Sequence, residues 1–86
     1  MSQRPIIRDA KLGRKGAVGM YYSSNNGRRR SLIEIDPKQK PRAYMNTVIH
    51  ETLHHYVPDI SECEVRWLSA GLTDALWRTH FRKLAT

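Results

Sequence analysis

The sequence from Val48 to Pro58 reads Val-Ile-His-Glu-Thr-Leu-His-His-Tyr-Val-Pro, and it decides most of the fold of this 86-residue chain. Apolar residues recur in it at helical spacing, and the proline then removes a backbone donor and stops the helix. Residues four apart in a helix lie on one face, so His50 and His54 can direct their imidazoles at one point. The stretch therefore predicts a helix that presents a pair of histidines.

The predicted helix covers residues 41–56, and Pro41 suits its first turn because its missing N–H would have no helical partner there. The two histidines border the expected core stripe of this helix, at the edge between the core and a cleft. The stripe consists of six residues at helical spacing: Met45, Val48, Ile49, Thr52, Leu53 and Tyr56.

A second helix is predicted over residues 61–82, where Ser61 followed by Glu64 has the pattern of a capping box. The connector, residues 57–61, is short, so the two helices should be antiparallel neighbours. Gly71 is expected to mark a close approach of this helix to the first one. Its buried stripe should contain Val65, Leu68, Ser69, Leu72, Leu76 and Phe81.

Residues 17–36 predict a β-hairpin. Residues 17–23 are β-prone, and Asn25-Asn26-Gly27 then supplies the strongest short-range turn signal for a hairpin. In the return strand, residues 30–36, one face is apolar and the other is mixed, which is typical of a strand near a sheet edge.

Residues 1–15 are basic and have no clear period, so they predict an irregular N-terminal arm. The predicted fold class is α+β, with a small antiparallel β-hairpin or sheet packed on two antiparallel helices in a single domain, residues 1–86. A chain of this size buries only about 60% of its unfolded surface, so a bound metal would contribute to its stability.

The net charge of +7 is unevenly distributed along the chain. Residues 1–42 contain eleven Lys and Arg against three acids, whereas residues 43–86 contain four against five. The run Arg28, Arg29 and Arg30 could attract nucleic acid or an acidic protein surface. No aromatic residue interleaves with these arginines, and a solvated, solubilising face is the simpler interpretation.

The single cysteine, Cys63, excludes an intramolecular disulfide, and the chain starts without an apolar signal segment. No apolar run approaches the roughly 20 residues that span a bilayer. We therefore expect a soluble cytoplasmic protein with no membrane partner, and its oligomeric state stays open.

Two neutral imidazoles on one helix face suit a zinc ion, which catalytic sites bind through three protein ligands and one open position. The start of the second helix should lie near His54 and supply the third ligand. A helical wheel ranks Glu62 first, Glu64 second because it serves the capping box, and Asp59 third. Acids also favour a helix N-terminus for electrostatic reasons alone. Three further potential ligands are expected to lie outside the site: His55, Cys63 and His80.

Glu51 follows the first histidine directly, a position from which its carboxylate could reach a zinc-bound water. Zinc would lower the pKa of that water from about 15.7 towards about 7, and Glu51 would accept the proton as general base. The resulting nucleophile would attack a carbonyl polarised by the metal. This chemistry points to hydrolysis of peptide or amide bonds.

The stretch from residue 47 to 77 resembles the zincin metallopeptidases, and more narrowly small phage and bacterial proteins reminiscent of minimal or SprT-like zincins. In these, a His-Glu-x-x-His helix is followed by a Pro-Asp-apolar-Ser-Glu turn, here residues 58–62, and by a second helix ending in Leu-Trp, here residues 76–77. The resemblance implies a minimal zincin-like fold in which the strand at residues 32–36 is the edge strand above the metal helix. It also implies a role for four residues, with His50, His54 and Glu62 as zinc ligands and Glu51 as general base.

The expected function is that of a zinc-dependent hydrolase, a metallopeptidase with a peptide or protein substrate. Two alternatives stay open from the sequence. One is a zinc-stabilised module without catalysis, and the other is a nucleic-acid-binding protein that uses Arg28, Arg29 and Arg30 in the basic N-terminal half.

Overall fold

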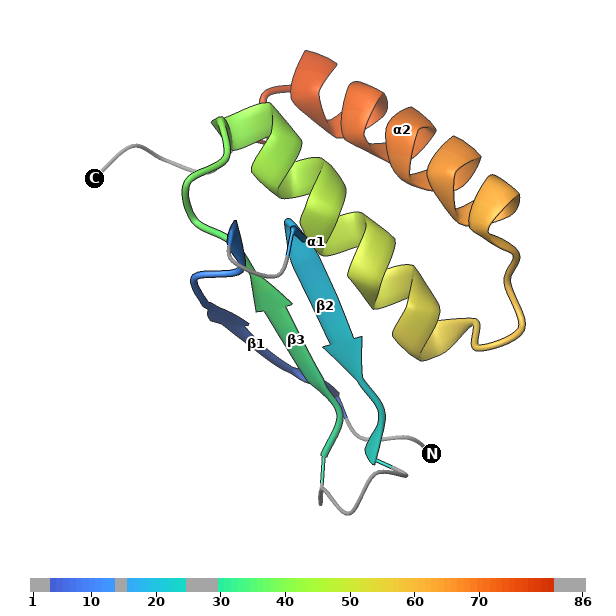
Figure 1. Ribbon diagram of the computed structural model, residues 1–86. Helices are drawn as coiled ribbons and strands as arrows, with labels where there is room; N and C mark the ends of the chain where they lie inside the picture. The colour runs from blue at the N-terminus through green and yellow to red at the C-terminus, as the bar shows by residue number, and fades with distance from the viewer. Residues whose placement is uncertain (1–3, 14–15, 25–29, 82–86) are drawn as a thin grey trace.

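The computed structural model describes residues 4–13, 16–24 and 30–81 (Figure 1). α1 lies between the β-sheet and α2, so the sheet and the two helices form successive layers. This arrangement confirms the predicted α+β class. The elements follow one another as β1 (Ile6–Asp9), β2 (Gly19–Tyr22), β3 (Leu32–Ile35), α1 (Pro41–Tyr56) and α2 (Glu62–Arg78).

The sheet is mixed, with the strand order β1-β3-β2. β2 and β3 pair antiparallel, as predicted for the hairpin, whereas the predicted turn at residues 25–27 lies outside the described residues. β1 pairs parallel with β3, so the predictions of a purely antiparallel sheet and of an irregular arm over residues 1–15 are wrong. β3 is consequently the central strand, so its predicted position near a sheet edge is wrong, and β1 and β2 are the two edge strands.

Alternation along the strands directs one face of the sheet towards α1. Ile33 and Ile35 of β3 lie on this face and are fully buried. Gly19 and Tyr21 are their register partners in β2 and share the face. On the opposite face, Arg8 donates through two nitrogens to the Glu34 carboxylate, at 2.9 and 3.1 Å, which links β1 to β3.

α1 begins at Pro41 as predicted, but its core contact is narrower than the sequence suggests. Thr47 is its buried residue, while Tyr56 from the predicted stripe is 52% exposed. Tyr44 donates a hydrogen bond to Asp9, which attaches α1 to the edge strand β1. Donation to this carboxylate raises the pKa of the Tyr44 phenol to about 12.

α2 ends at Arg78, earlier than the predicted residue 82, and it buries a narrow line of residues, Val65, Ser69 and Thr73. α2 packs mainly against one helix, so a single row at i, i+4 and i+8 is covered. A Cβ at Gly71 would meet no atom within 4 Å, so the predicted close approach there is wrong. Three residues of the predicted stripe are exposed: Leu72, Leu76 and Phe81.

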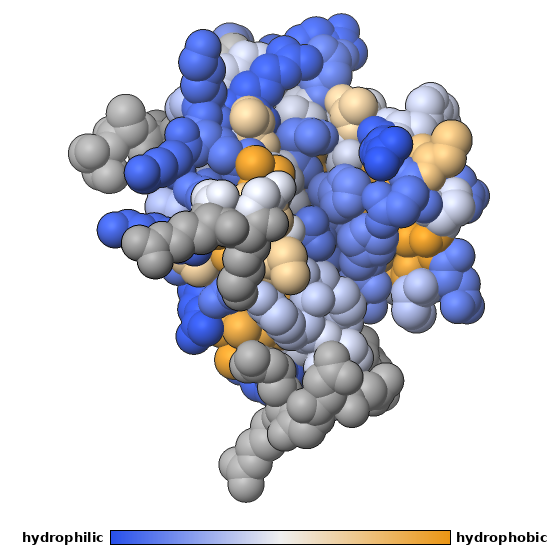
Figure 2. Space-filling model, viewed as in Figure 1, coloured by the Kyte–Doolittle hydropathy of each residue, from blue (hydrophilic) through white to orange (hydrophobic). Residues whose placement is uncertain are grey.

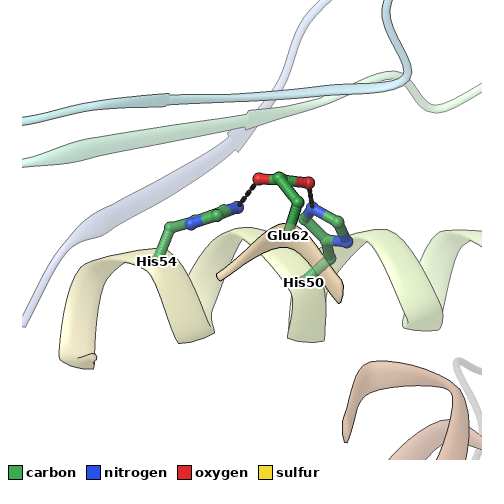
Figure 3. Close-up of side chains that lie close together, drawn as sticks. All are labelled: His50, His54 and Glu62. Carbon is green, nitrogen blue, oxygen red and sulfur yellow. Dashed lines mark ion pairs between the residues drawn. The ribbon is translucent and has the colours of Figure 1, made fainter. Parts of the chain in front are cut away.

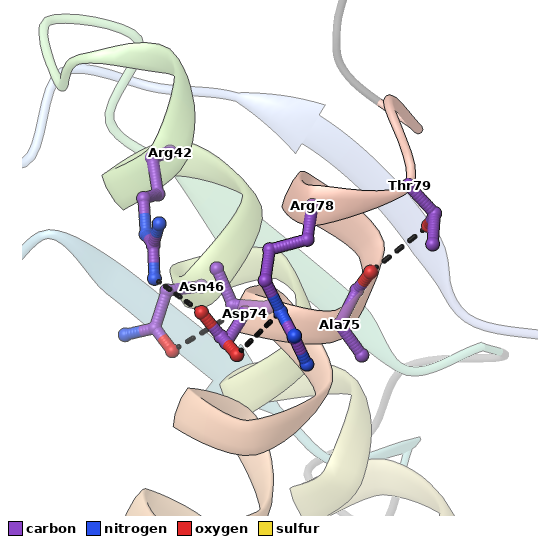
Figure 4. A network of polar contacts seen from close by, with 7 residues as sticks. Arg42, Asn46, Asp74, Ala75, Arg78 and Thr79 are labelled. Carbon is purple, nitrogen blue, oxygen red and sulfur yellow. Dashed lines mark hydrogen bonds and ion pairs between the residues drawn. The ribbon is translucent and has the colours of Figure 1, made fainter.

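The two helices run antiparallel and are joined by polar contacts near the start of α1. The Thr73 hydroxyl donates to the side-chain amide oxygen Oδ1 of Asn46 at 3.2 Å, and Arg42 pairs with Asp74 at 3.2 Å (Figure 4). Arg78 approaches the other oxygen of Asp74, at 3.0 Å. On the face shown in Figure 2, hydrophobic residues form separate small patches within a largely hydrophilic surface.

Candidate metal centre

Three side chains from two helices converge at the end where α1 leads into α2. The Nε2 atom of His54 lies 3.0 Å from Oε1 of Glu62, and Nε2 of His50 lies 3.7 Å from Oε2 of the same carboxylate (Figure 3). One ligand atom from each of these residues lies within 4.8 Å of the others. The two histidine side chains are 23% and 22% exposed, and that of Glu62 is 59% exposed.

This donor set fits a metal ion. Zinc–ligand bonds of about 2.0–2.2 Å at tetrahedral angles place neighbouring ligand atoms about 3.3 Å apart. The contacts of 3.0 and 3.7 Å, which involve the two different oxygens of Glu62, lie on either side of this value. His50, His54 and Glu62 therefore form a group that could hold a metal ion.

Local sequence explains why Glu62 points towards α1. The Ser61 hydroxyl accepts from the Glu64 backbone N–H at 3.1 Å, and the Glu64 carboxylate accepts from the Ser61 N–H at 3.2 Å. These bonds form the predicted capping box, which fixes the first turn of α2. Glu62, the first residue after the Ser61 cap, faces α1 in this turn. Hydrogen bonding to the Ser61 side chain, and secondly to the Ser61 backbone N–H, lowers the pKa of the Glu64 carboxyl group.

The residues ranked below Glu62 do not join the cluster. Glu64 is engaged in the capping box, and Asp59 and Cys63 are exposed outside the group of three. His55 has a different partner, because its Nδ1 lies 3.2 Å from the Tyr21 hydroxyl. His80 is exposed beyond the end of α2.

The side chain of Glu51 lies beside the cluster, between α1 and the edge strand β2. A Cβ built on Gly19 would be 3.2 Å from Oε2 of Glu51 and 2.5 Å from Cγ2 of Thr47. The strand therefore passes directly over this part of α1 because position 19 has no side chain. Burial is the main cause that raises the pKa of Glu51, the Glu62 carboxylate adds to it, and the imidazoles of His50 and His54 oppose it.

Sequence reasoning missed Gly19 and Thr47 as parts of the site. An isolated glycine within a β-prone stretch is a known signal of a close backbone approach, and Gly19 carries that signal. The partner of the approach is not visible in the sequence, because it depends on how α1 crosses the sheet.

Three hollows lie along α1, two of them against β2 and one against α2, and we refer to this row of hollows as the groove. The first, of about 440 Å³, is shared by Gly19, Glu51 and His54. The second, of about 130 Å³, also contains Gly19 and Glu51 and adds His50. The third, of about 440 Å³, shares Asn46 with the second and extends to the start of α1. The potential metal ligands of α1 thus line the first two hollows, which share Gly19 and Glu51.

The free edge of β2 forms one wall of this groove. The Asp36 N–H donates to the Val18 carbonyl at 2.8 Å, which identifies this pair as hydrogen-bonded in the antiparallel ladder. Hydrogen-bonded and non-bonded pairs alternate, so the backbone N–H and C=O groups of Gly19 and Tyr21 point away from β3. They face the open edge, where no strand of the described residues pairs with β2.

The basic run predicted as a nucleic-acid surface is described only in part, because Arg28 and Arg29 lie outside the described residues. Arg30 is exposed, and its guanidinium donates to the Arg4 carbonyl at 2.6 and 3.1 Å. Arg4, Arg30 and Tyr56 line one hollow of about 340 Å³ on a different part of the surface.

Within the described part of the chain, no helix is both long and apolar enough to cross a membrane. No protein-family model, curated protein or solved structure matches the chain.

Proposed function

We propose that the chain is a zinc-dependent hydrolase that cleaves peptide bonds. The observation that supports this function most directly is the approach of His50, His54 and Glu62 to one point, beside the half-buried carboxylate of Glu51. Two imidazoles with one carboxylate favour zinc over calcium or magnesium, which prefer sites made of oxygen ligands.

The roles of the residues follow from their positions. A bound zinc ion would supply Lewis acidity, which polarises a carbonyl oxygen and lowers the pKa of a coordinated water. Glu51 accepts a proton at its carboxylate, is kept close to the reacting atoms by the strand above it, and passes the proton to the leaving amine. The predicted resemblance to minimal zincins agrees with these roles but does not establish them.

The edge of β2 suits the binding of an extended peptide. The outward backbone groups of Gly19 and Tyr21 can form main-chain hydrogen bonds with an added strand. The resemblance implied that residues 32–36 are the edge strand above the metal helix, but β3 is the central strand, so β2 has this position. A peptide on this edge would cross the groove directly above Glu51 and the two histidines.

The experiment combines metal stoichiometry with turnover for matched variants. Native mass spectrometry should find one zinc per chain in the wild type and in Glu51→Gln, and none in His54→Ala. His80→Ala, which removes an exposed histidine outside the cluster, should keep the metal. Turnover of a mixed peptide library should fall by about 10² to 10⁴ in Glu51→Gln, the contribution typical of general-base catalysis. Wild-type activity in this variant would refute the assignment of the base.

The same experiment separates the enzyme from a zinc-stabilised module without catalysis. Such a module would bind zinc through the same three residues and would lose stability when the metal is removed. It would cleave no member of the peptide library, and Glu51→Gln would not change its metal content.

A second candidate function is nucleic-acid binding, which the hollow between Arg4, Arg30 and Tyr56 favours. Tyr56 is 52% exposed there, so a base could stack on its ring while the two arginines approach phosphates. Binding of a single-stranded oligonucleotide should then fall steeply with salt, weaken in Tyr56→Ala and be indifferent to chelator. An affinity that does not change with salt would exclude this function.

A further inference from the structure

The end of the groove beside the start of α1 is lined by residues that have no role in the proposed hydrolysis. Its hollow of about 440 Å³ is bounded by the two helices, and two of its lining residues, Ala43 and Ala70, are small enough to leave room for an incoming side chain. The remaining lining residues are polar or basic: Lys40, Arg42, Asn46 and Thr73.

This end of the groove has an excess of positive charge. Asp74 is shared by Arg42 and Arg78, at 3.2 and 3.0 Å, so one carboxylate balances two guanidiniums. Lys40 is exposed and has no carboxylate partner among residues 4–13, 16–24 and 30–81. The first turn of α1 contains no acidic residue, and the helix dipole adds to the positive potential there.

The position of this basic end relative to the metal ligands sets a spacing. Ala43 precedes His50 by seven residues of α1, which corresponds to about 10 Å along the helix. An extended peptide covers that distance in about three residues. A side chain about three residues from the scissile bond would therefore reach Lys40 and Arg42.

The direction of β2 determines on which side of the scissile bond that residue lies. β2 runs in the same direction as α1. Gly19 lies over Thr47, and Tyr21, two residues further along β2, contacts His55, which lies further along α1. Figure 1 shows β2 and α1 running alongside one another in the same direction. A peptide that pairs antiparallel with β2 would therefore run the opposite way, from the end of α1 towards its start. The residues that lie over the basic end are thus C-terminal to the scissile bond.

We infer that the groove selects peptides with an acidic side chain about three residues on the C-terminal side of the scissile bond, through Lys40 and Arg42. This inference rests on the proposed hydrolase function. The glutamate or aspartate carboxylate of the substrate would lie between the two cationic side chains, above Ala43 and Ala70.

The test uses pairs of peptides derived from any library member that the wild type cleaves, identical except for Glu or Gln at the third residue after the cleaved bond. We expect kcat/KM to favour Glu about threefold to tenfold, as expected for one or two solvent-accessible charge pairs. The preference should shrink as salt is raised. Lys40→Glu should abolish or reverse it, whereas Lys11→Glu, the same charge change outside the groove, should leave it intact.

Binding of the same peptides to zinc-loaded Glu51→Gln, followed by fluorescence anisotropy, separates failure of this inference from failure of the hydrolase. Cleavage without a preference for Glu, or a preference unaffected by Lys40→Glu, overturns the inference and leaves the hydrolase intact. If the wild type cleaves no library member, the pairs are made from library peptides that bind zinc-loaded Glu51→Gln, and Lys40-dependent preference for the Glu peptide then upholds the groove and refutes the hydrolase. A preference for an acidic residue on the N-terminal side overturns the stated direction.

Discussion

Gly19 of β2 and Thr47 of α1 approach so closely that a Cβ atom at position 19 would lie 2.5 Å from the Thr47 Cγ2 atom. This contact sets the distance between β2 and α1. It also explains why a threonine is the buried residue of α1, where the sequence pattern favoured larger apolar side chains.

Gly19→Ala should therefore push β2 away from α1. We expect a loss of about 1–3 kcal/mol in the free energy of unfolding, the usual cost of inserting a methyl group into a packed contact. Turnover should fall as well, because Glu51 lies under the same strand. Urea denaturation and peptide cleavage measure the two effects. A Gly19→Ala protein as stable and active as the wild type would contradict the close approach.

Gly71→Ala is the matched control, because a Cβ there would meet no atom within 4 Å. Alanine in place of an exposed glycine within a helix should stabilise the protein by about 0.5–1 kcal/mol. The urea midpoint should rise, and zinc binding should not change. A lower midpoint would show that Gly71 has a contact in the native protein that the structure does not contain.

Asp36 should make stability depend on pH. Its carboxylate accepts from the backbone N–H groups of Lys38, at 2.9 Å, and Leu12, at 3.0 Å, and these bonds lower its pKa. Because the folded pKa lies below the unfolded one, the contribution is complete above about pH 5 and is lost as pH falls through the folded pKa. Urea midpoints measured between pH 7 and pH 2 should show a steeper acid loss in the wild type than in Asp36→Asn. Equal acid losses would disprove the role of this carboxylate.

Zinc should raise the thermal stability of the protein. A ligand at 100 times its dissociation constant stabilises the native state by about 2.7 kcal/mol, which in a domain this small raises Tm by roughly ten degrees or more. We expect the increase in the wild type and in His80→Ala, its reversal by chelator, and no increase in His54→Ala. A zinc-dependent rise in His54→Ala equal to that of the wild type would place the metal elsewhere.

Ser61→Ala should weaken both the fold and metal binding. The loss of the capping box costs about 1 kcal/mol, and the first turn of α2 that positions Glu62 would fray. Glu64→Gln keeps an acceptor for the Ser61 N–H, so it should retain both properties. Calorimetric titration with zinc can compare the three proteins. Equal affinities in Ser61→Ala and the wild type would mean that the cap does not position the ligand.

The features that could be predicted from the sequence are those written in local patterns. The proline at the start of α1, the Ser61–Glu64 capping box and the four-residue spacing of His50 and His54 each act within a few residues. Once the short connector makes the helices antiparallel, Glu62 is brought to the two histidines by the same local rules.

The features that could not be predicted depend on partners far apart in the chain. Ile6 pairs with Leu32, 26 positions later in the chain, and the sequence of the short strand β1 does not indicate a parallel partner. The exposure of Leu72 and Leu76 likewise follows from α2 having one main packing partner, which a helical wheel does not reveal. The central position of β3, which was predicted to lie near a sheet edge, follows from the same missed pairing with β1.

The strand order described above also has a kinetic consequence. β2, β3, α1 and the start of α2 follow one another directly, so the candidate metal centre of His50, His54 and Glu62 can form through contacts between neighbouring elements. β1 must instead close a long loop to reach β3, and loop closure is the slow, entropically costly step of such topologies. We expect β1 to dock last during refolding, and its amide hydrogens, from Ile6 to Asp9, to exchange with solvent before those of β3.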